Sequence, residues 1–187
     1  RTDAGRVAVI DGGTAADAPY LRGFLAALGN RVEWWFVTHP HIDHMGALTE
    51  ILRTPGGIEI GTIYQSPMND AQLNTDLNRR KLADAYLEAL AASGLRVEKG
   101  VTYLDVWGAL ADENGNLDKR YTLDGLHLKV LQVNDTTTLV NAYNNASIVL
   151  RLWDKRKSLL MLGDTGEESG DRLLRSVPQE ELDCDYI

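Results

Sequence analysis

The sequence predicts a single-domain α/β protein, and three features of the chain support that fold class. Short apolar runs rich in β-branched residues alternate with segments whose apolar residues recur at helical spacing, which is typical of a sheet covered by helices. Glycine, proline and asparagine mark turns between these segments. The length of 187 residues, with 44% hydrophobic and 25% charged residues, is that of one folded globular domain. We therefore expect residues 1–187 to form one domain with its own core.

The first half of the chain predicts three strands, each followed by a helix. Each strand is a short apolar run, and each helix repeats apolar residues every three or four positions before a glycine or a proline. In order, these are a strand at 6–11 and a helix at 17–28, a strand at 33–38 and a helix at 46–53, and a strand at 58–65 and a helix at 69–93.

The second half of the chain is mostly strand. Asn114-Gly115, within the polar stretch 112–116, is a strong hairpin signal. The expected strands lie at 101–106, 121–133, 146–153, 157–163 and 184–187, with a helix at 170–176 before the last of them. This mixture indicates at least one sheet that contains hairpins and is covered by helices.

Composition and charge exclude several classes of function. The 19 Lys and Arg against 27 Asp and Glu give a formal charge of −8, and no stretch gathers enough basic residues to attract a long nucleic acid. No apolar run approaches the roughly 20 residues that a membrane span needs. The single cysteine, Cys184, excludes an internal disulfide and a multi-cysteine zinc site. We therefore expect a small-molecule substrate rather than a nucleic-acid or membrane partner.

Three of the four histidines lie within six residues, directly after the strand predicted at 33–38. His39 and His41 are two positions apart, so an extended loop can point both imidazoles the same way. Asp43 and His44 lie where the next helix begins and leave the loop in another direction. Imidazole and carboxylate both bind zinc, and two sites a few ångströms apart can hold a bridging hydroxide. The pattern predicts up to two metal ions, with zinc favoured by the histidines and Fe or Mn also compatible with the aspartates.

The stretch His39-Pro40-His41-Ile42-Asp43-His44 resembles the HxHxDH signature of the metallo-β-lactamase fold superfamily. Two shorter motifs resemble that family in the same order, one strand that ends in Asp11-Gly12-Gly13 and a later one that ends in Gly163-Asp164. The resemblance implies the fold of the family, an α/β protein built as a four-layer αββα sandwich.

The resemblance also implies a role for each residue. His39 and His41 would hold one ion, Asp43 and His44 the other, Asp164 would bridge the two ions, and Asp11 would support the ligands from behind. A hydroxide that bridges two metal ions is a nucleophile near neutral pH, so the resemblance implies a metal-dependent hydrolase. Asp43 would also act in catalysis by orienting that hydroxide.

The middle of the chain departs from the family pattern. Many members place a further histidine ligand before the bridging aspartate, but the candidate here, His127, alternates with apolar neighbours as a solvent-facing strand residue does. The corresponding position holds Asn144-Asn145-Ala146-Ser147, which resembles the branch that includes competence DNA-uptake proteins and phosphorylcholine esterases. Asn145 is either a catalytic hydrogen-bond donor to a substrate oxygen or part of an Asx turn that opens a strand.

The resemblance predicts that the chain is truncated at both ends. It begins with Arg1 rather than methionine, and the strand that ends in a final histidine ligand in the family would continue beyond Ile187. We expect the second metal site to lack that ligand in residues 1–187.

The leading hypothesis for function is a hydrolase of a small phosphoester or phosphodiester, because the Asn-Asn-x-Ser branch includes enzymes of that type. A lactam- or thioester-cleaving metallo-hydrolase is an alternative that the absence of the middle histidine disfavours. A third alternative is a metal-binding or redox member of the family without hydrolytic activity.

Overall fold

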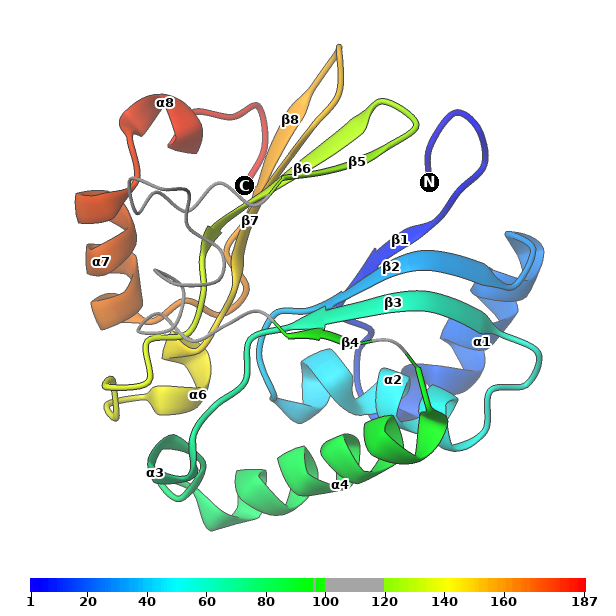
Figure 1. Cartoon of the computed structure of the whole chain (residues 1–187), viewed down its shortest axis with the longest axis horizontal. Coiled ribbons are helices and arrows are strands. Elements are labelled where there is room, and N and C mark those ends of the chain that lie inside the picture. The colour runs from blue at the N-terminus through cyan, green and yellow to red at the C-terminus, as the bar shows by residue number, and fades with distance from the viewer. Residues whose placement is uncertain (96, 100–119) are drawn as a thin grey trace.

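The computed structural model describes residues 1–95, 97–99 and 120–187. Two four-stranded sheets pack face to face, and helices cover the outer face of each sheet (Figure 1). The αββα sandwich predicted from the sequence is therefore confirmed.

The first sheet is parallel, and its strands lie side by side in sequence order. They are β1 (Ala8–Ile10), β2 (Arg31–Val37), β3 (Glu59–Gln65) and β4 (Val97–Lys99). Because right-handed crossovers that all proceed in one direction place the connecting helices on one face, the other face is left for the second sheet. The connecting helices are η1 (Ala15–Asp17), α1 (Ala18–Ala27), α2 (Ile42–Arg53), α3 (Asp70–Leu73) and α4 (Leu77–Ser93). Figure 1 shows α1, α2 and α4 together on one side of this sheet.

The second sheet is antiparallel, again in sequence order. Its strands are β5 (Arg120–Leu123), β6 (Leu126–Gln132), β7 (Val149–Trp153) and β8 (Ser158–Met161). Among the described residues, three helices accompany it, namely α6 (Ala142–Asn145), α7 (Glu167–Ser176) and α8 (Gln179–Leu182). The helices α7 and α8 lie on the side of this sheet that faces away from the first one (Figure 1).

Three apolar layers hold the sandwich together. The largest lies between the first sheet and its helices and contains the fully buried Trp35. In the layer between the sheets, Phe36 stacks on Tyr64 with 4.5 Å between ring centres, and Tyr121 of the second sheet meets both rings edge-on. The third layer lies between the second sheet and α7, whose Leu173 is buried in it. Aromatic contacts therefore fix the first sheet against the second.

Three helices differ in extent from their predictions, and one of them, α7, begins three residues before the predicted 170–176. The helix predicted at 69–93 is divided into α3 and α4, because the carboxylate of Asp76 accepts hydrogen bonds from the backbone N–H groups of Asn78 and Arg79 and so caps a new helix. The helix predicted at 46–53 begins four residues earlier, at Ile42. Cap chemistry, which periodicity does not report, sets the boundary between α3 and α4.

The strand predicted at 121–133 is instead the hairpin of β5 and β6. Asp124 and Gly125 have φ angles of 50° and 82°, and two consecutive positive φ angles make the tight turn that reverses the chain. The strand predicted at 101–106 and the turn predicted at 112–116 lie outside the described residues.

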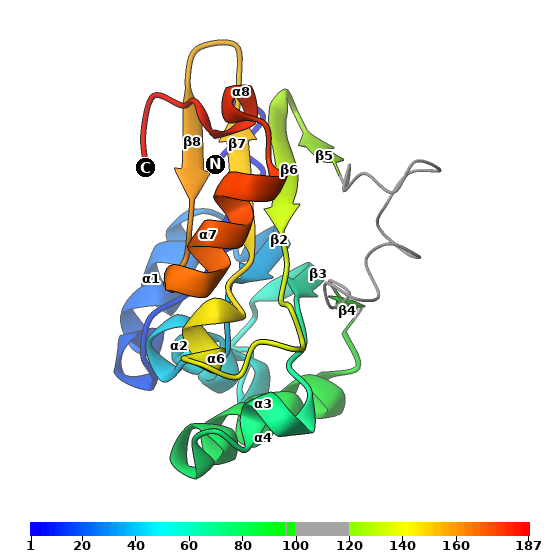
Figure 2. The same ribbon diagram turned by 90° about the vertical axis from the view of Figure 1, so that its left-hand side faces the viewer.

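Both ends of the chain lie at one end of the sandwich, and α3 and α6 lie at the other (Figures 1 and 2). The segment predicted as a strand at 184–187 makes a single parallel bridge, between Tyr186 and Leu159 of β8. The edge of the second sheet is therefore covered at this point.

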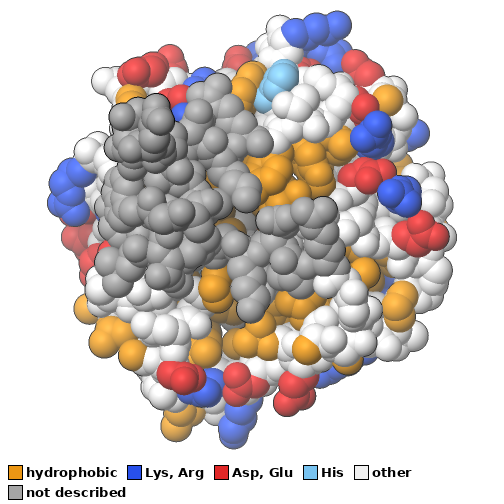
Figure 3. All heavy atoms as spheres, viewed as in Figure 1, with side chains coloured by type: hydrophobic (Ala, Val, Ile, Leu, Met, Phe, Trp, Pro, Cys, Tyr) orange, Lys and Arg blue, Asp and Glu red, His pale blue; other side chains and the backbone are white. Residues whose placement is uncertain are grey.

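The surface carries charges of both signs. In the face shown in Figure 3, hydrophobic side chains gather in the middle, and acidic and basic side chains are interspersed around the rim. No helix within the described ranges is long and apolar enough to cross a membrane.

Candidate metal centre

The fold brings the predicted ligands together where segments of both sheets end. Asp11 follows β1, His39 and His41 follow β2, Asp43 and His44 lie in the first turn of α2, and Asp164 follows β8. Parallel strands send their carboxyl ends to the same edge of a sheet, and the pairing of β1 with β2 brings Asp11 beside the histidine loop.

His39 and His41 form the first pair of candidate ligands. His39 is only 1% exposed, and its Nε2 lies 2.9 Å from Nδ1 of His41. Two nitrogens that each bind zinc at about 2.0–2.1 Å lie roughly 2.9–3.4 Å apart, so this spacing suits one shared ion. The Nδ1 of His39 lies 3.1 Å from the hydroxyl of Thr38. When Nδ1 donates its proton to that hydroxyl, Nε2 is left as an unprotonated ligand atom.

His44 is oriented from behind by Asp11. Its Nδ1 donates to Oδ2 of Asp11 at 2.8 Å, which leaves Nε2 as the ligand atom. Asp11 also accepts hydrogen bonds from the backbone N–H and the hydroxyl of Thr38, each at 2.8 Å. Asp11 has a φ of 58°, which is uncommon for a residue with a side chain. These contacts are those expected of a residue that supports the ligands from behind.

Asp164 lies between the two pairs of candidate ligands. Its Oδ1 is 3.3 Å from Nε2 of His44, and its Oδ2 is 3.8 Å from Nε2 of His39. One ligand atom from each of these three residues lies within 4.8 Å of the others. Asp43 is on the His44 side, with its Oδ2 3.7 Å from Nε2 of that histidine. The carboxylates of Asp43 and Asp164 are 60% and 42% exposed, so the site is open to solvent.

Burial and neighbouring charges set the protonation of the three imidazoles. Burial lowers the pKa of His39 to about 2, and burial, followed by the charge of Arg79, lowers the pKa of His41. The hydrogen bond to Asp11 raises the pKa of His44. Because metal ions bind neutral imidazole, His39 and His41 are ready ligands at neutral pH, whereas a metal ion competes with a proton at His44.

The donor set is compatible with metal binding. Three imidazoles and two carboxylates converge from two directions, and this mixture suits Zn, Fe or Mn. The carboxylate of Asp164 faces both His39 and His44, as a ligand shared by two ions would.

A family model described as the metallo-beta-lactamase superfamily matches residues 1–182. The chain belongs to the metallo-beta-lactamase superfamily. No curated protein matches it.

Two solved structures of this fold are similar to the chain at low identity. One is a Cronobacter sakazakii protein described as a metallo-beta-lactamase with a HARLDQ motif, at 16% identity and a TM-score of 0.42, with 90% of this chain and 60% of that one covered. The other is CmlA, a diiron beta-hydroxylase from Streptomyces venezuelae, at 14% identity and a TM-score of 0.41, with 73% of this chain and 21% of that one covered. The chain thus spans 60% or less of the length of these two proteins. Membership of the superfamily rests on the family model.

Ser147 fixes the position of Asp164 in this member of the metallo-beta-lactamase superfamily. The backbone N–H of Asp164 donates to the Ser147 hydroxyl at 3.1 Å. Gly163 has a φ of 58°, and a Cβ on it would lie 2.9 Å from the same hydroxyl, so glycine permits this close approach. Ile148, which follows Ser147, donates its N–H to the carbonyl of Thr38 at 2.9 Å. This bond ties the second sheet to the histidine loop.

Asn145 is fully buried and all of its amide groups have partners. Its Nδ2 donates to the carbonyl of Val140 at 2.8 Å and to Glu168 at 2.7 Å, and its Oδ1 accepts from the backbone N–H of Ser169 at 3.0 Å. An asparagine side chain has two N–H donors, and both are in use. This placement favours a structural role over the predicted catalytic role, because no donor is left for a substrate oxygen.

His127 lies on β6, outside the group of candidate ligands. Its ring stacks on Trp153 of the neighbouring strand with 5.4 Å between ring centres, and its Nδ1 lies 3.2 Å from the hydroxyl of Thr122. The alternation that predicted a strand residue rather than a ligand agrees with this position.

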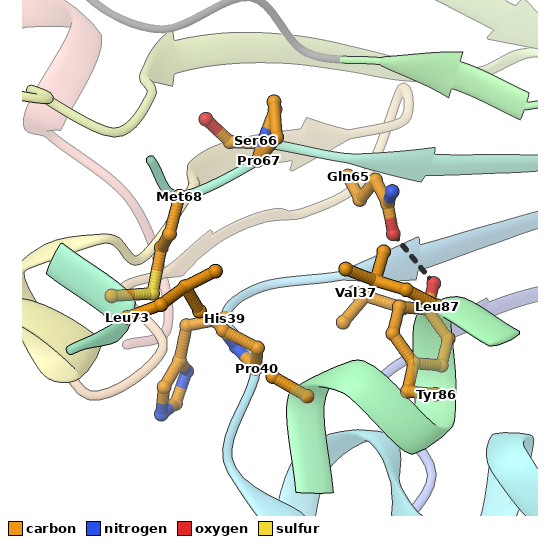
Figure 4. A pocket seen from close by; sticks show the side chains of 11 residues that line it. Val37, His39, Pro40, Gln65, Ser66, Pro67, Met68, Leu73, Tyr86 and Leu87 are labelled. Atoms are coloured by element: carbon orange, nitrogen blue, oxygen red, sulfur yellow. Dashed lines mark hydrogen bonds between the residues drawn. The ribbon is translucent and has the colours of Figure 1, made fainter. Parts of the chain in front are cut away.

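A small apolar cavity adjoins His39 on the side of α4 (Figure 4). Met68, Leu73 and Leu87 contribute to its lining, and the hydroxyl of Tyr86 closes one side by donating to Gln65 at 2.6 Å. The volume is about 50 Å³. A cavity of about 150 Å³ holds a benzene ring, so this one has room only for a short alkyl group.

Three residues that support the ligands were not expected from the sequence. Thr38 directly precedes the histidine motif and Ser147 ends the Asn144–Ser147 stretch, but their roles need the loops to be brought together. Tyr143 stacks on His41 with 5.5 Å between ring centres and 9° between planes. The Nε2 of His41 is buried with no hydrogen-bond partner among the described residues, so this stacking, rather than a hydrogen bond to Nε2, holds the ring. No local pattern in the sequence marks Tyr143.

We expect the substitution Asp11→Asn to weaken metal binding by about 10- to 100-fold, the usual effect of removing a carboxylate that orients a histidine ligand. An amide nitrogen does not accept the proton of His44 Nδ1, so the tautomer of His44 would no longer be fixed. Competition with a chromophoric chelator measures the affinity. Asp3→Asn is the charge-matched control, because the carboxylate of Asp3 is 83% exposed and pairs with Arg156 rather than with a candidate ligand. Equal affinities in the two variants would contradict a supporting role for Asp11.

Proposed function

We propose that this chain carries the centre of a metal-dependent hydrolase with two zinc ions that acts on a small phosphoester or phosphodiester. The observation that carries the proposal is the carboxylate of Asp164, which presents one oxygen to His44 and the other to His39. A carboxylate placed in this way can be shared by two ions held by different histidines.

The residues divide into two ligand sets around that carboxylate. His39 and His41 would hold one ion, and Asp43 and His44 would hold the other, with Asp164 common to both. When bound, the ions would supply a nucleophile active at neutral pH and charge stabilisation for the scissile group.

The side chains around the ligands keep protons where ligation requires them. Thr38 can accept the Nδ1 proton of His39, and Asp11 can accept the Nδ1 proton of His44, so in each neutral ring Nε2 would face the site without a proton. The carboxylate of Asp43, which is exposed and near His44, would orient an attacking water molecule.

A phosphoester is favoured over a lactam or a thioester for two reasons. The Asn144–Ser147 stretch resembles the branch with phosphodiester enzymes, and a cation, Arg79, lies close enough to influence the pKa of His39 and His41. A lactam- or thioester-cleaving enzyme and a redox or metal-binding member remain the alternatives, and Fe or Mn remain alternatives to zinc.

The test is turnover by the metal-loaded protein. We expect the zinc-loaded chain to hydrolyse bis-(p-nitrophenyl) phosphate, and chelation to abolish the reaction. Asp164→Asn should reduce the rate by at least about 100-fold, more than the loss of a merely supporting group. Asp171→Asn, an exposed acid on α7, should leave the rate unchanged. Turnover of nitrocefin or a thioester in place of the phosphodiester would favour the second function, and a filled site with no turnover of any substrate would favour the third.

A further inference from the structure

Arg79 lies in the first turn of α4, at the end of the helix whose side chains contact Tyr143. The buried residues of α4 include Ala83 and Tyr86, which pack against the first sheet. Arg79 precedes Ala83 by four residues and so extends the same stripe by one turn. Helical side chains lean toward the N-terminus of their helix, which directs Arg79 beyond the end of the core.

The guanidinium of Arg79 lies over Tyr143. Its Cζ is 5.8 Å from the centre of the Tyr143 ring. The same ring stacks on the candidate ligand His41, with 5.5 Å between ring centres. The ring is 1% exposed, and its hydroxyl donates to the carbonyl of Leu73 at 3.0 Å. Burial raises the pKa of Tyr143 to about 12, so the phenol stays neutral. Tyr143 is therefore a fixed platform between α4 and the histidine loop.

Most of the hydrogen-bonding capacity of Arg79 is unused. Across residues 1–95, 97–99 and 120–187, its guanidinium has one polar partner, Asp76, whose Oδ2 lies 3.5 Å from Nε. The other carboxylate oxygen of Asp76 caps α4. The Arg79 side chain is 47% exposed, so the two outer nitrogens of the guanidinium can meet a ligand. A guanidinium presents these donors in a planar fork that matches two oxygens of a phosphate.

The charge of Arg79 reaches the candidate ligands. It is among the causes that lower the pKa of both His39 and His41. The charge of Arg79 would add to that of bound ions, so an anion at the centre would be attracted by both.

We propose that Arg79 binds a phosphoryl oxyanion of the substrate beside the metal centre and so selects anionic esters over neutral ones. The inference rests on the proposed hydrolase function and adds a substrate-binding residue to it. Tyr143 positions Arg79 and stacks on His41 with the same ring, which links the position of the anion to that of a metal ligand.

Kinetics on two substrates with the same leaving group test the proposal. In Arg79→Gln we expect KM for bis-(p-nitrophenyl) phosphate to rise about 10- to 100-fold, as for the loss of a hydrogen bond to a charged group. The neutral tris-(p-nitrophenyl) phosphate should be affected less than twofold. Arg79→Lys should recover part of the loss, because it keeps the charge without the fork. Lys81→Gln is the matched control, since it removes the same charge from an exposed position about 200° further round α4.

Binding of inorganic phosphate to the zinc-loaded protein separates this inference from the proposed function. Calorimetry should show phosphate bound at least about 10-fold more weakly by Arg79→Gln than by the wild type, with equal zinc content in both. That result without turnover of any ester would overturn the hydrolase function and support the anion site. Turnover of the diester with an unchanged KM in Arg79→Gln would overturn the anion site alone, as would an equal loss for the neutral triester.

Discussion

Replacing His39 by alanine should abolish tight metal binding at both candidate positions and with it all metal-dependent turnover. His39 is the most buried of the candidate ligands, and its Nε2 lies 2.9 Å from His41 and 3.8 Å from Asp164. Removing it takes away one ligand. It also removes the ring that lies beside both His41 and the carboxylate of Asp164. We expect affinity to fall by well over the roughly 100-fold that supporting residues account for.

Metal analysis after dialysis against trace zinc measures this effect, and circular dichroism checks that the variant is folded. His127→Ala is the matched control, because its ring stacks on Trp153 of the second sheet, outside the group of ligands. A metal content in His39→Ala equal to that of the control would show that the ions bind elsewhere.

Replacing Gly46 by alanine should destabilise the fold by about 1–3 kcal/mol or more, as expected for a methyl group forced into a packed contact. A Cβ on Gly46 would lie 2.6 Å from the backbone nitrogen of Ala15 and 2.9 Å from the carbonyl carbon of Thr14. Neither atom belongs to a side chain that can rotate away. The whole loop after β1 must therefore shift, and Asp11 at its start would move away from His44.

Urea unfolding of the zinc-free protein measures the loss of stability, and zinc affinity reports the shift of Asp11. Gly23→Ala is the matched control, since Gly23 is also helical but has nothing within 4 Å of its added Cβ. There the same substitution should stabilise the protein by about 0.5–1 kcal/mol, because alanine loses less backbone freedom on folding. Similar stabilities for the two variants would contradict the close packing of α2 against the loop.

Much of the candidate site could be predicted from the sequence because its ligands are local. His39, His41, Asp43 and His44 lie on one loop and the helix turn that follows it, so their spacing alone indicates two directions of ligation. Asp164 was predicted through the resemblance of its Gly-Asp step after an apolar strand to a family motif. The alternation of strands and helices indicated an α/β protein, and the resemblance supplied the four-layer arrangement.

The contacts that refine the site could not be predicted, because they join segments far apart in the chain. Ser147 holds the backbone of Asp164, and Arg79 reaches Tyr143 only once α4 has packed on the first sheet. Asn145 is the clearest case. Its sequence context suggested either a donor to substrate or part of an Asx turn, whereas Glu168 and Ser169, which follow in a later helix, take up its amide.

The division of the ligands between the two sheets has a consequence for the order of folding. His39, His41, Asp43 and His44 belong to the first sheet and its helices, whose parallel strands pair across helical crossovers. Asp164 arrives with β8, and the bonds from Ile148 to Thr38 and from Asp164 to Ser147 form only when the second sheet has docked. Complete metal coordination therefore requires that both sheets have docked, and bound ions would hold the two halves of the sandwich together in the finished protein.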